Sequence, residues 1–198
     1  MYEHAVPGAA RARTSTGQLL LFVGNMIAGK GQDDAVAAFN RIARDFPAAR
    51  LRFVGGDMGL AKNRVFQASV EQAAKAGPAA DRIEFRGASN DLGPDYAEAF
   101  AALNFSASES FSITCLDACA AGLPVIATRC GGPEEILDDG VTGWLVPVGD
   151  VAAMADKMAC LLEHRAQAAA MGAAGQTLVE ERFSADDAWA RFRALFDL

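Results

Sequence analysis

Short apolar runs alternate with longer amphipathic stretches along most of this chain, and the alternation is typical of βαβ units that form a parallel sheet. The runs predicted to be strands are 19–23, 51–54, 82–85, 103–105, 125–127 and 144–146. The stretches predicted to be helices are 32–45, 60–76, 96–102, 113–121, 134–137 and 151–163, with two more in the tail 165–196. We therefore expect an α/β fold, a three-layer doubly wound parallel sheet of about six strands that is Rossmann-like.

The domain organisation follows from length and local composition. The 198 residues suffice for one domain with a full core, and no polar linker divides them. Residues 1–17 lack an apolar period and are rich in small residues and turn formers, which indicates a linker or disordered start. Residues 18–198 are then expected to form one domain.

Charge and residue usage exclude several classes of protein. A net charge of −7 argues against nucleic acid as the main partner, because phosphate binding needs basic residues. No apolar run approaches the roughly 18 residues that span a bilayer, so we expect no transmembrane segment. The protein is expected to be cytoplasmic, with a peripheral place at the inner membrane face as an alternative.

Cysteine and histidine content gives no sign of a disulfide framework or a metal site. The four cysteines form no Cys-x-x-Cys pair and are expected to be free, buried thiols. His4 and His164 are the only histidines, and neither lies near a carboxylate cluster. We therefore expect neither a bound metal nor a catalytic triad.

Glycine-containing loops follow the first three predicted strands. The carboxyl ends of parallel strands meet at one edge, where open sheets bind their ligands. The groups expected around one crevice there are Gly24, Gly55, Gly87 and the loop 106–111. Each loop alone indicates little, because glycine after a strand is more often turn chemistry than ligand contact.

The first of these loops places Lys30 just before a predicted helix, as a phosphate-binding loop does. It is not a P-loop, because Gly31 follows Lys30 where a Ser or Thr would bind magnesium. The alternative is an ordinary strand-to-helix turn with a solvated lysine.

The segment 108–121 places two carboxylates around a predicted helix start. Ser110, Ser112 and Thr114 would cap or open the helix, whose free N–H groups and dipole attract a diphosphate. Asp117 lies about one turn further in, where it needs a cleft or a polar partner such as a ribose diol. Glu109, before the helix, would face a sugar. The alternative is a solvated loop acid and a helix-surface charge.

The final predicted helix carries an apolar stripe. Ser184 would cap it, and Trp189, Phe192 and Phe196 recur on one face. The stripe either packs on the protein's own sheet or stays exposed and promotes self-association.

Taken together, these motifs resemble the nucleotide-binding C-terminal domain of the group 1, or family 4, retaining glycosyltransferases of the GT-B fold. The resemblance covers nearly all of residues 19–183. Its parts are the segments 23–31, 53–55, 108–117, 122–125, 131–136 and 140–147, with the loop at Gly87. Each part alone is an ordinary turn, so the specificity lies in their order and spacing.

The resemblance implies a site for a nucleotide diphosphate sugar, UDP- or GDP-linked, that works without a metal ion or other cofactor. Lys30 matches the diphosphate-binding lysine and Glu109 the carboxylate near the donor sugar, so these two are the expected catalytic residues. The expected substrate-binding residues are Asn25, Lys30, Gly87, Glu109, Ser110, Phe111, Ser112, Ile113, Thr114 and Asp117.

Several of these positions depart from the family pattern. Asn25 stands where the family often has Arg, and Asp117 is one methylene shorter than the glutamate that binds the ribose. Ser112 replaces a family glycine, so its side chain either narrows the pocket or contributes a hydroxyl. Arg86 and Gly87 match the loop that frames the base, mostly through backbone groups.

The implied activity is hexosyl transfer with retention at the anomeric carbon. The enzymes that the chain resembles have two Rossmann-like domains, and residues 1–17 leave no room for an N-terminal acceptor domain. We therefore expect an excised domain, a fragment or a subunit that needs another chain, inactive alone or dependent on that N-terminal half. A nucleotide-sugar-binding module without turnover is the alternative; a phosphorylase-like relative or an unrelated nucleotide binder is a third.

Overall fold

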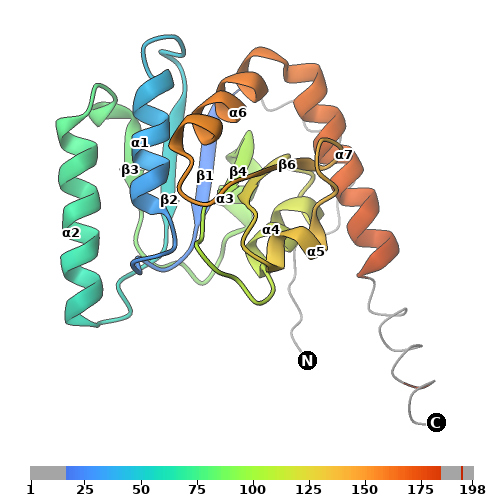
Figure 1. The fold of residues 1–198 in the computed structure, drawn as a ribbon, viewed down its shortest axis with the longest axis horizontal. Helices are drawn as coiled ribbons and strands as arrows, with labels where there is room; N and C mark the ends of the chain where they lie inside the picture. The colour runs from blue at the N-terminus through green and yellow to red at the C-terminus, as the bar shows by residue number, and fades with distance from the viewer. Residues whose placement is uncertain (1–16, 184–192, 194–198) are drawn as a thin grey trace.

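A computed structural model describes residues 17–183 and residue 193. Within these residues, six parallel strands form one sheet in the order β3-β2-β1-β4-β5-β6. The strands are β1 (Leu19–Val23), β2 (Arg50–Val54), β3 (Ile83–Phe85), β4 (Ala101–Asn104), β5 (Val125–Thr128) and β6 (Gly143–Val146). The predicted doubly wound α/β fold is confirmed (Figure 1).

Helices cover both faces of the sheet. They are α1 (Gln32–Ile42), α2 (Ala61–Ala76), α3 (Gly93–Glu98), α4 (Ile113–Ala120), α5 (Gly132–Ile136), α6 (Val151–Glu163) and α7 (Arg165–Arg182), with a 3-10 turn η1 (Ala80–Arg82). Helix α1 packs against α2 and α6, and α4 packs against α5 and α7. Figure 1 shows α1 and α2 at the left of the view and α7 along the right.

Alternating residues of the central strand supply two separate cores. Leu20 and Phe22 of β1 pack in the same cluster as Phe39 of α1, while Leu21 points to the other face and packs with Cys115 of α4. All five are fully or nearly fully buried. A parallel sheet covered on both faces needs such continuous apolar strands, which explains why the strands stood out in the sequence.

One predicted helix is wrong at its end. The helix expected at 96–102 is α3, which begins at Gly93 and ends at Glu98, and residues 101–104 form β4. Pro94 in the first turn explains the earlier start. Ala101 pairs with Leu20 in the sheet, so strand pairing at a buried site overrides the helix propensity of alanine.

Most other predicted elements match the structure within a few residues, and α6 agrees at both ends. The helix predicted to reach residue 45 stops at Ile42. In the tail, α7 ends at Arg182, and the capped helix with its apolar stripe lies outside the described residues.

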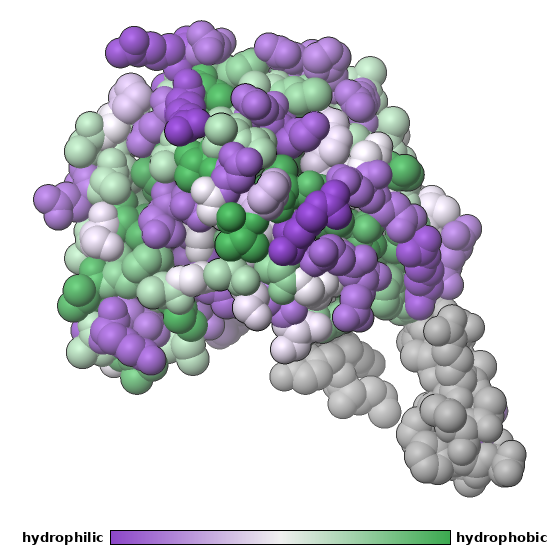
Figure 2. Space-filling model, viewed as in Figure 1, coloured by the Kyte–Doolittle hydropathy of each residue, from purple (hydrophilic) through white to green (hydrophobic). Residues whose placement is uncertain are grey.

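The surface seen in Figure 2 mixes hydrophilic and hydrophobic residues rather than separating them into large zones. Among the described residues, none of the helices combines the length and hydrophobicity that crossing a bilayer requires.

The turn from β1 into α1 depends on Gly31, and its replacement tests that dependence. Gly31 has φ +80°, and an added Cβ would lie 2.2 Å from the carbonyl oxygen of Phe105. Gly29 has φ +91° but no atom within 4 Å of such a Cβ. Gly31→Ala should lower the unfolding free energy by about 3 kcal/mol or more and Gly29→Ala by about 1–2 kcal/mol, measured by urea denaturation. Equal losses would show that the contact with Phe105 does not constrain this turn.

Candidate functional site

The site lies where the strand order reverses. Strands β1 and β4 are neighbours, but the chain leaves β1 toward β2 on one side and leaves β4 toward β5 on the other. The loops that follow them therefore diverge above the sheet edge, and open α/β sheets bind ligands in the crevice so formed. Ala107 donates its N–H to the carbonyl of Gly29 at 2.8 Å, so the two loops are joined at their base.

Lys30, in the loop after β1, forms an ion pair with Glu109, in the loop after β4. The Lys30 ammonium lies 2.7 Å from Glu109 Oε1, and the Ser106 hydroxyl donates to the same oxygen at 2.8 Å. The side chains are 33% and 16% exposed, so the pair lies at the surface of the crevice and can reach a ligand. An ammonium has three donors, and one bond to Glu109 leaves two for an anion.

The backbone of Glu109 is fixed from the neighbouring loop that joins β5 to α5. Glu109 donates its N–H to the carbonyl of Cys130 at 3.1 Å, and its own carbonyl accepts from Gly132 at 2.7 Å. A Cβ on Gly132 would lie 2.7 Å from Phe111 Cα and 2.8 Å from Ser112 N, so only glycine fits there. The backbone that carries the carboxylate is therefore held firmly between the loop after β4 and the loop that joins β5 to α5.

The N-terminus of α4 opens beside this junction. Ser112 is its cap, and the Ser112 hydroxyl accepts from Cys115 N at 3.4 Å. The same hydroxyl accepts from the side-chain amide of Asn104 at 2.7 Å, and Ser112 is only 2% exposed. The serine hydroxyl is thus directed into the protein beneath the helix.

The remaining expected ligand-binding residues lie on the same loops. Ser110 is exposed, and Phe111 and Ile113 are exposed large apolar residues. Phe111 also packs edge-on against Phe183 after α7, with ring centroids 6.0 Å apart. Asn25 is exposed, and its carbonyl accepts from Gln32 at 2.8 Å.

Asp117 lies one turn inside α4 and is half-buried. Its charge reaches Tyr96 of α3, where burial first and the carboxylate of Asp117 second raise the pKa of the phenol. The Tyr96 phenol is therefore neutral at physiological pH, and the Asp117 carboxylate lies close enough to influence it.

The cysteines are free among the described residues, but not all are buried as predicted. Cys115 and Cys119 are buried, whereas Cys130 and Cys160 are only partly so. Burial raises the pKa of Cys115 to about 12, so its thiol is not reactive. Within residues 17–183 and 193, no three His, Cys, Asp or Glu side chains gather in a way that could hold a metal ion.

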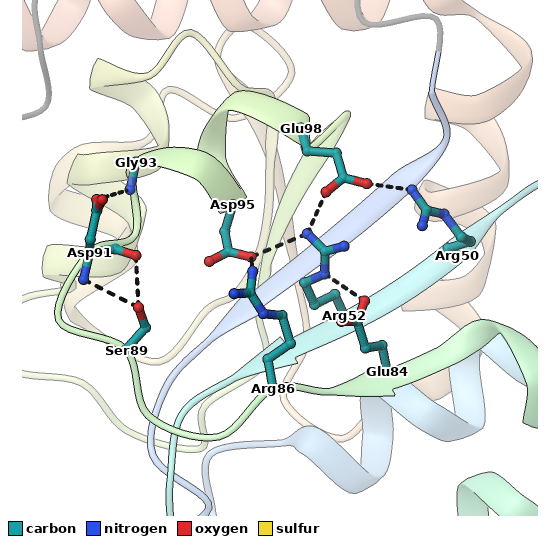
Figure 3. Close-up of polar contacts among 9 residues, drawn as sticks. All are labelled: Arg50, Arg52, Glu84, Arg86, Ser89, Asp91, Gly93, Asp95 and Glu98. Carbon is teal, nitrogen blue, oxygen red and sulfur yellow. Dashed lines mark hydrogen bonds and ion pairs between the residues drawn. The ribbon is translucent and has the colours of Figure 1, made fainter.

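A buried arginine supports the loop expected to frame a base (Figure 3). Arg52 of β2, 8% exposed, binds Asp95 at 3.2 Å, Glu98 at 2.7 Å and Glu84 at 2.8 Å. Asp95, 1% exposed, also binds Arg86 at 2.7 Å, and Arg86 begins the loop that contains Gly87. Hydrogen bonds from Arg52 and Arg50 lower the pKa of Glu98, so this carboxylate is ionised at neutral pH.

Gly87 itself lies beside the second loop of the crevice. Its carbonyl accepts from Gly55 N at 2.8 Å, and Gly24 donates to the carbonyl of Val54 at 2.9 Å. The three loops expected to gather at one edge are thus connected to one another.

Two residues that hold the site together were missed in the sequence. Ser106 orients Glu109, and Asn104 bonds the cap of α4. The sequence does contain a sign of the role of Asn104. Its amide lies between the apolar residues Leu103 and Phe105 of a predicted buried strand, and a buried amide needs polar partners.

This geometry defines a Rossmann-like domain with a lysine, a carboxylate and a helix N-terminus at the switch point of its sheet. The chain belongs to the family described as Glycosyl transferases group 1, whose pattern it matches over residues 17–164. It is 35% identical over 181 residues to a D-inositol 3-phosphate glycosyltransferase of Frankia alni, covering 86% of this chain and 44% of the relative. It is 28% identical over 179 residues to an N-acetyl-alpha-D-glucosaminyl L-malate synthase of Bacillus anthracis, covering 90% and 45%.

Solved GT-B glycosyltransferases share the fold. HepE from Anabaena, solved with UDP and glucose, superposes with a TM-score of 0.83 at 20% identity, over 91% of this chain and 48% of HepE. The C-terminal domain of the group 1 protein LpcC from Francisella tularensis gives 0.77 at 23% identity, over 85% and 88%. The chain thus spans less than half the length of the curated relatives above and most of a solved C-terminal domain.

The Arg52 cluster predicts unequal effects for two carboxylates. Asp95→Ala should lower the unfolding free energy by about 3 kcal/mol, because it leaves the buried Arg52 without one of its partners. Glu98→Ala should cost less than about 1 kcal/mol, because Glu98 is 44% exposed and water can replace it. Urea unfolding of the two variants measures the difference, and a larger loss for Glu98→Ala would contradict the account.

Proposed function

We propose that this chain is the donor-binding domain of a retaining glycosyltransferase and binds a nucleotide diphosphate sugar, UDP- or GDP-linked. The observation that carries the proposal is the Lys30–Glu109 pair beside the N-terminus of α4 at the switch point of the sheet. A cation and free backbone amides attract a diphosphate, and the adjacent carboxylate suits sugar hydroxyls.

The substrate class is supported by the family and by relatives that act on sugars. HepE was solved with UDP and glucose, and it shares the fold of this chain. A mannosyltransferase of Mycolicibacterium smegmatis that is 30% identical over 176 residues is described as GDP-mannose-dependent. Either nucleotide is therefore proposed, and the base and donor sugar are to be determined by titration.

In the proposed reaction, the bond between the anomeric carbon and the diphosphate oxygen breaks, and negative charge grows on that oxygen. The anomeric carbon bonds to the oxygen of an acceptor hydroxyl, whose proton passes to the leaving diphosphate. Lys30 and the first-turn amides of α4 stabilise this charge, a role that can change the rate by about 10²–10³ for each donor. Glu109 orients the sugar. Because the positive charge comes from the protein, the proposed donor site needs no metal ion.

Asp117 is proposed to bind the ribose. It lies one turn after the N-terminus of α4. If the diphosphate binds at that N-terminus, the attached nucleoside would lie near this position. The loop at Gly87, supported by the Arg86–Asp95 ion pair, is proposed to frame the base. The activity that these residues carry is donor binding, and transfer additionally requires an acceptor site.

Replacing Lys30 tests the phosphate contact. Lys30→Ala should weaken binding of UDP or GDP by about 10–100-fold, because a charged hydrogen bond to the diphosphate is lost. Binding of the free nucleoside should change little. Lys75→Ala, which removes an exposed lysine of α2, is the matched control and should leave both affinities unchanged. Isothermal titration calorimetry measures them, and equal losses for diphosphate and nucleoside would show that Lys30 does not bind phosphate.

Replacing Asp117 tests the ribose contact. Asp117→Asn keeps the size of the side chain but removes the charge that strengthens hydrogen bonds to a diol. Binding of UDP and of uridine, or of GDP and guanosine, should weaken together by about 3–10-fold, with thermal stability nearly unchanged. Unchanged affinity for every nucleotide would remove Asp117 from the proposed site.

A further inference from the structure

Asn104 is a buried amide at the carboxyl end of β4, directly below the crevice. It is 5% exposed, and its side chain makes bonds in two directions. Oδ1 accepts from the N–H of Ser106 at 3.2 Å. Nδ2 donates to Ser112 Oγ at 2.7 Å and to Thr114 Oγ1 at 3.1 Å. One planar amide therefore bonds two different segments of the site.

The first direction leads to the carboxylate. Ser106, whose N–H is held by Asn104, donates its hydroxyl to Glu109 Oε1 at 2.8 Å. The carbonyl of Ser106 accepts from the Thr128 hydroxyl of β5 at 2.5 Å. Because Ser106 is 1% exposed and bonded at its N–H, carbonyl and hydroxyl, its position fixes the side chain of Glu109.

The donor side of the Asn104 amide contacts the N-terminus of α4. Ser112 caps the helix, and its hydroxyl also lies 3.2 Å from that of Thr114. Both hydroxyls are turned to the amide of Asn104, so the first turn of α4 is tied to the end of β4 through side chains. The direction in which the helix amides face the crevice is set by this contact.

We propose that Asn104 is a positioning residue of the donor site. It holds two segments in a fixed position relative to each other: the segment from Ser106 to Glu109 and the first turn of α4. The inference rests on the proposed function, and it assigns Asn104 no contact with the ligand. The amide is suited to this place because it offers an acceptor to Ser106 and donors to two hydroxyls at once. An apolar side chain of similar size would remove the donor to the Ser112 and Thr114 hydroxyls and the acceptor for the N–H of Ser106.

A carboxylate at this position would act differently. Asn104→Asp keeps the acceptor for Ser106 N–H, but it adds a negative charge directly behind the end of α4 that attracts an anion. Its effect on diphosphate binding should therefore exceed its effect on a ligand with fewer phosphate charges. Because this charge acts even without a positioning role, the second test if Asn104→Leu does not fold is Asn104→Ser, whose short hydroxyl cannot bridge Ser106 and Ser112. It should again weaken the diphosphate more than the monophosphate, and equal losses would overturn the inference.

The experiment compares UDP with UMP, or GDP with GMP, by calorimetry on the 198-residue chain. Asn104→Leu should weaken the diphosphate by about tenfold and the monophosphate by less than about threefold. The double variant Asn104→Leu, Ser112→Gly should not recover the lost affinity, because it removes the Ser112 hydroxyl but does not restore the link from Ser106 to the first turn of α4. A merely structural role would not change the ratio of the two affinities.

The matched control is Asn40→Leu, the same exchange at a half-buried amide of α1 on the opposite edge of the sheet. It should change neither affinity. Equal losses for diphosphate and monophosphate in Asn104→Leu, or full recovery in the double variant, would overturn the inference alone. If the unaltered chain binds neither UDP nor GDP, the proposed function fails and the inference fails with it.

Discussion

The reversal of strand order between β1 and β4 is the constraint on which the site depends. Right-handed crossovers carry the chain away from these two neighbouring strands in opposite directions, so the loops after them border a crevice. Lys30 follows one strand and Glu109 the other, separated by 79 positions in the sequence and by 2.7 Å in space. The ion pair is thus a product of topology: the sequence predicts that both residues lie at one edge of the sheet, but not that they are in contact.

The crevice keeps its shape because the loops approach one another through glycine and backbone hydrogen bonds. Gly31 touches the carbonyl of Phe105, and Gly132 lies against the backbone of Phe111 and Ser112, where no side chain would fit. The close approach leaves a cation and helix amides at the edge of a chain whose net charge is −7. The proposed anion site within an acidic protein would favour a small anionic ligand over a polyanion.

The sequence was sufficient for the fold class, because apolar strands buried on both faces and amphipathic helices are local patterns. It was insufficient at residues 101–102, where alanine favours a helix but pairing with β1 makes a strand. It also grouped Lys30, Glu109 and Ser112 at one edge, since every parallel strand ends there. The contact from Asn104 to Ser112 could not be predicted, because it depends on how α4 docks onto β4.

A crystal structure of the chain with UDP or GDP bound tests the central claim most directly. The account predicts a phosphate oxygen within hydrogen-bond distance of Lys30 Nζ and of a backbone amide in the first turn of α4, with the ribose beside Asp117. A nucleotide bound elsewhere on the surface, or a diphosphate that touches neither Lys30 nor α4, would contradict it.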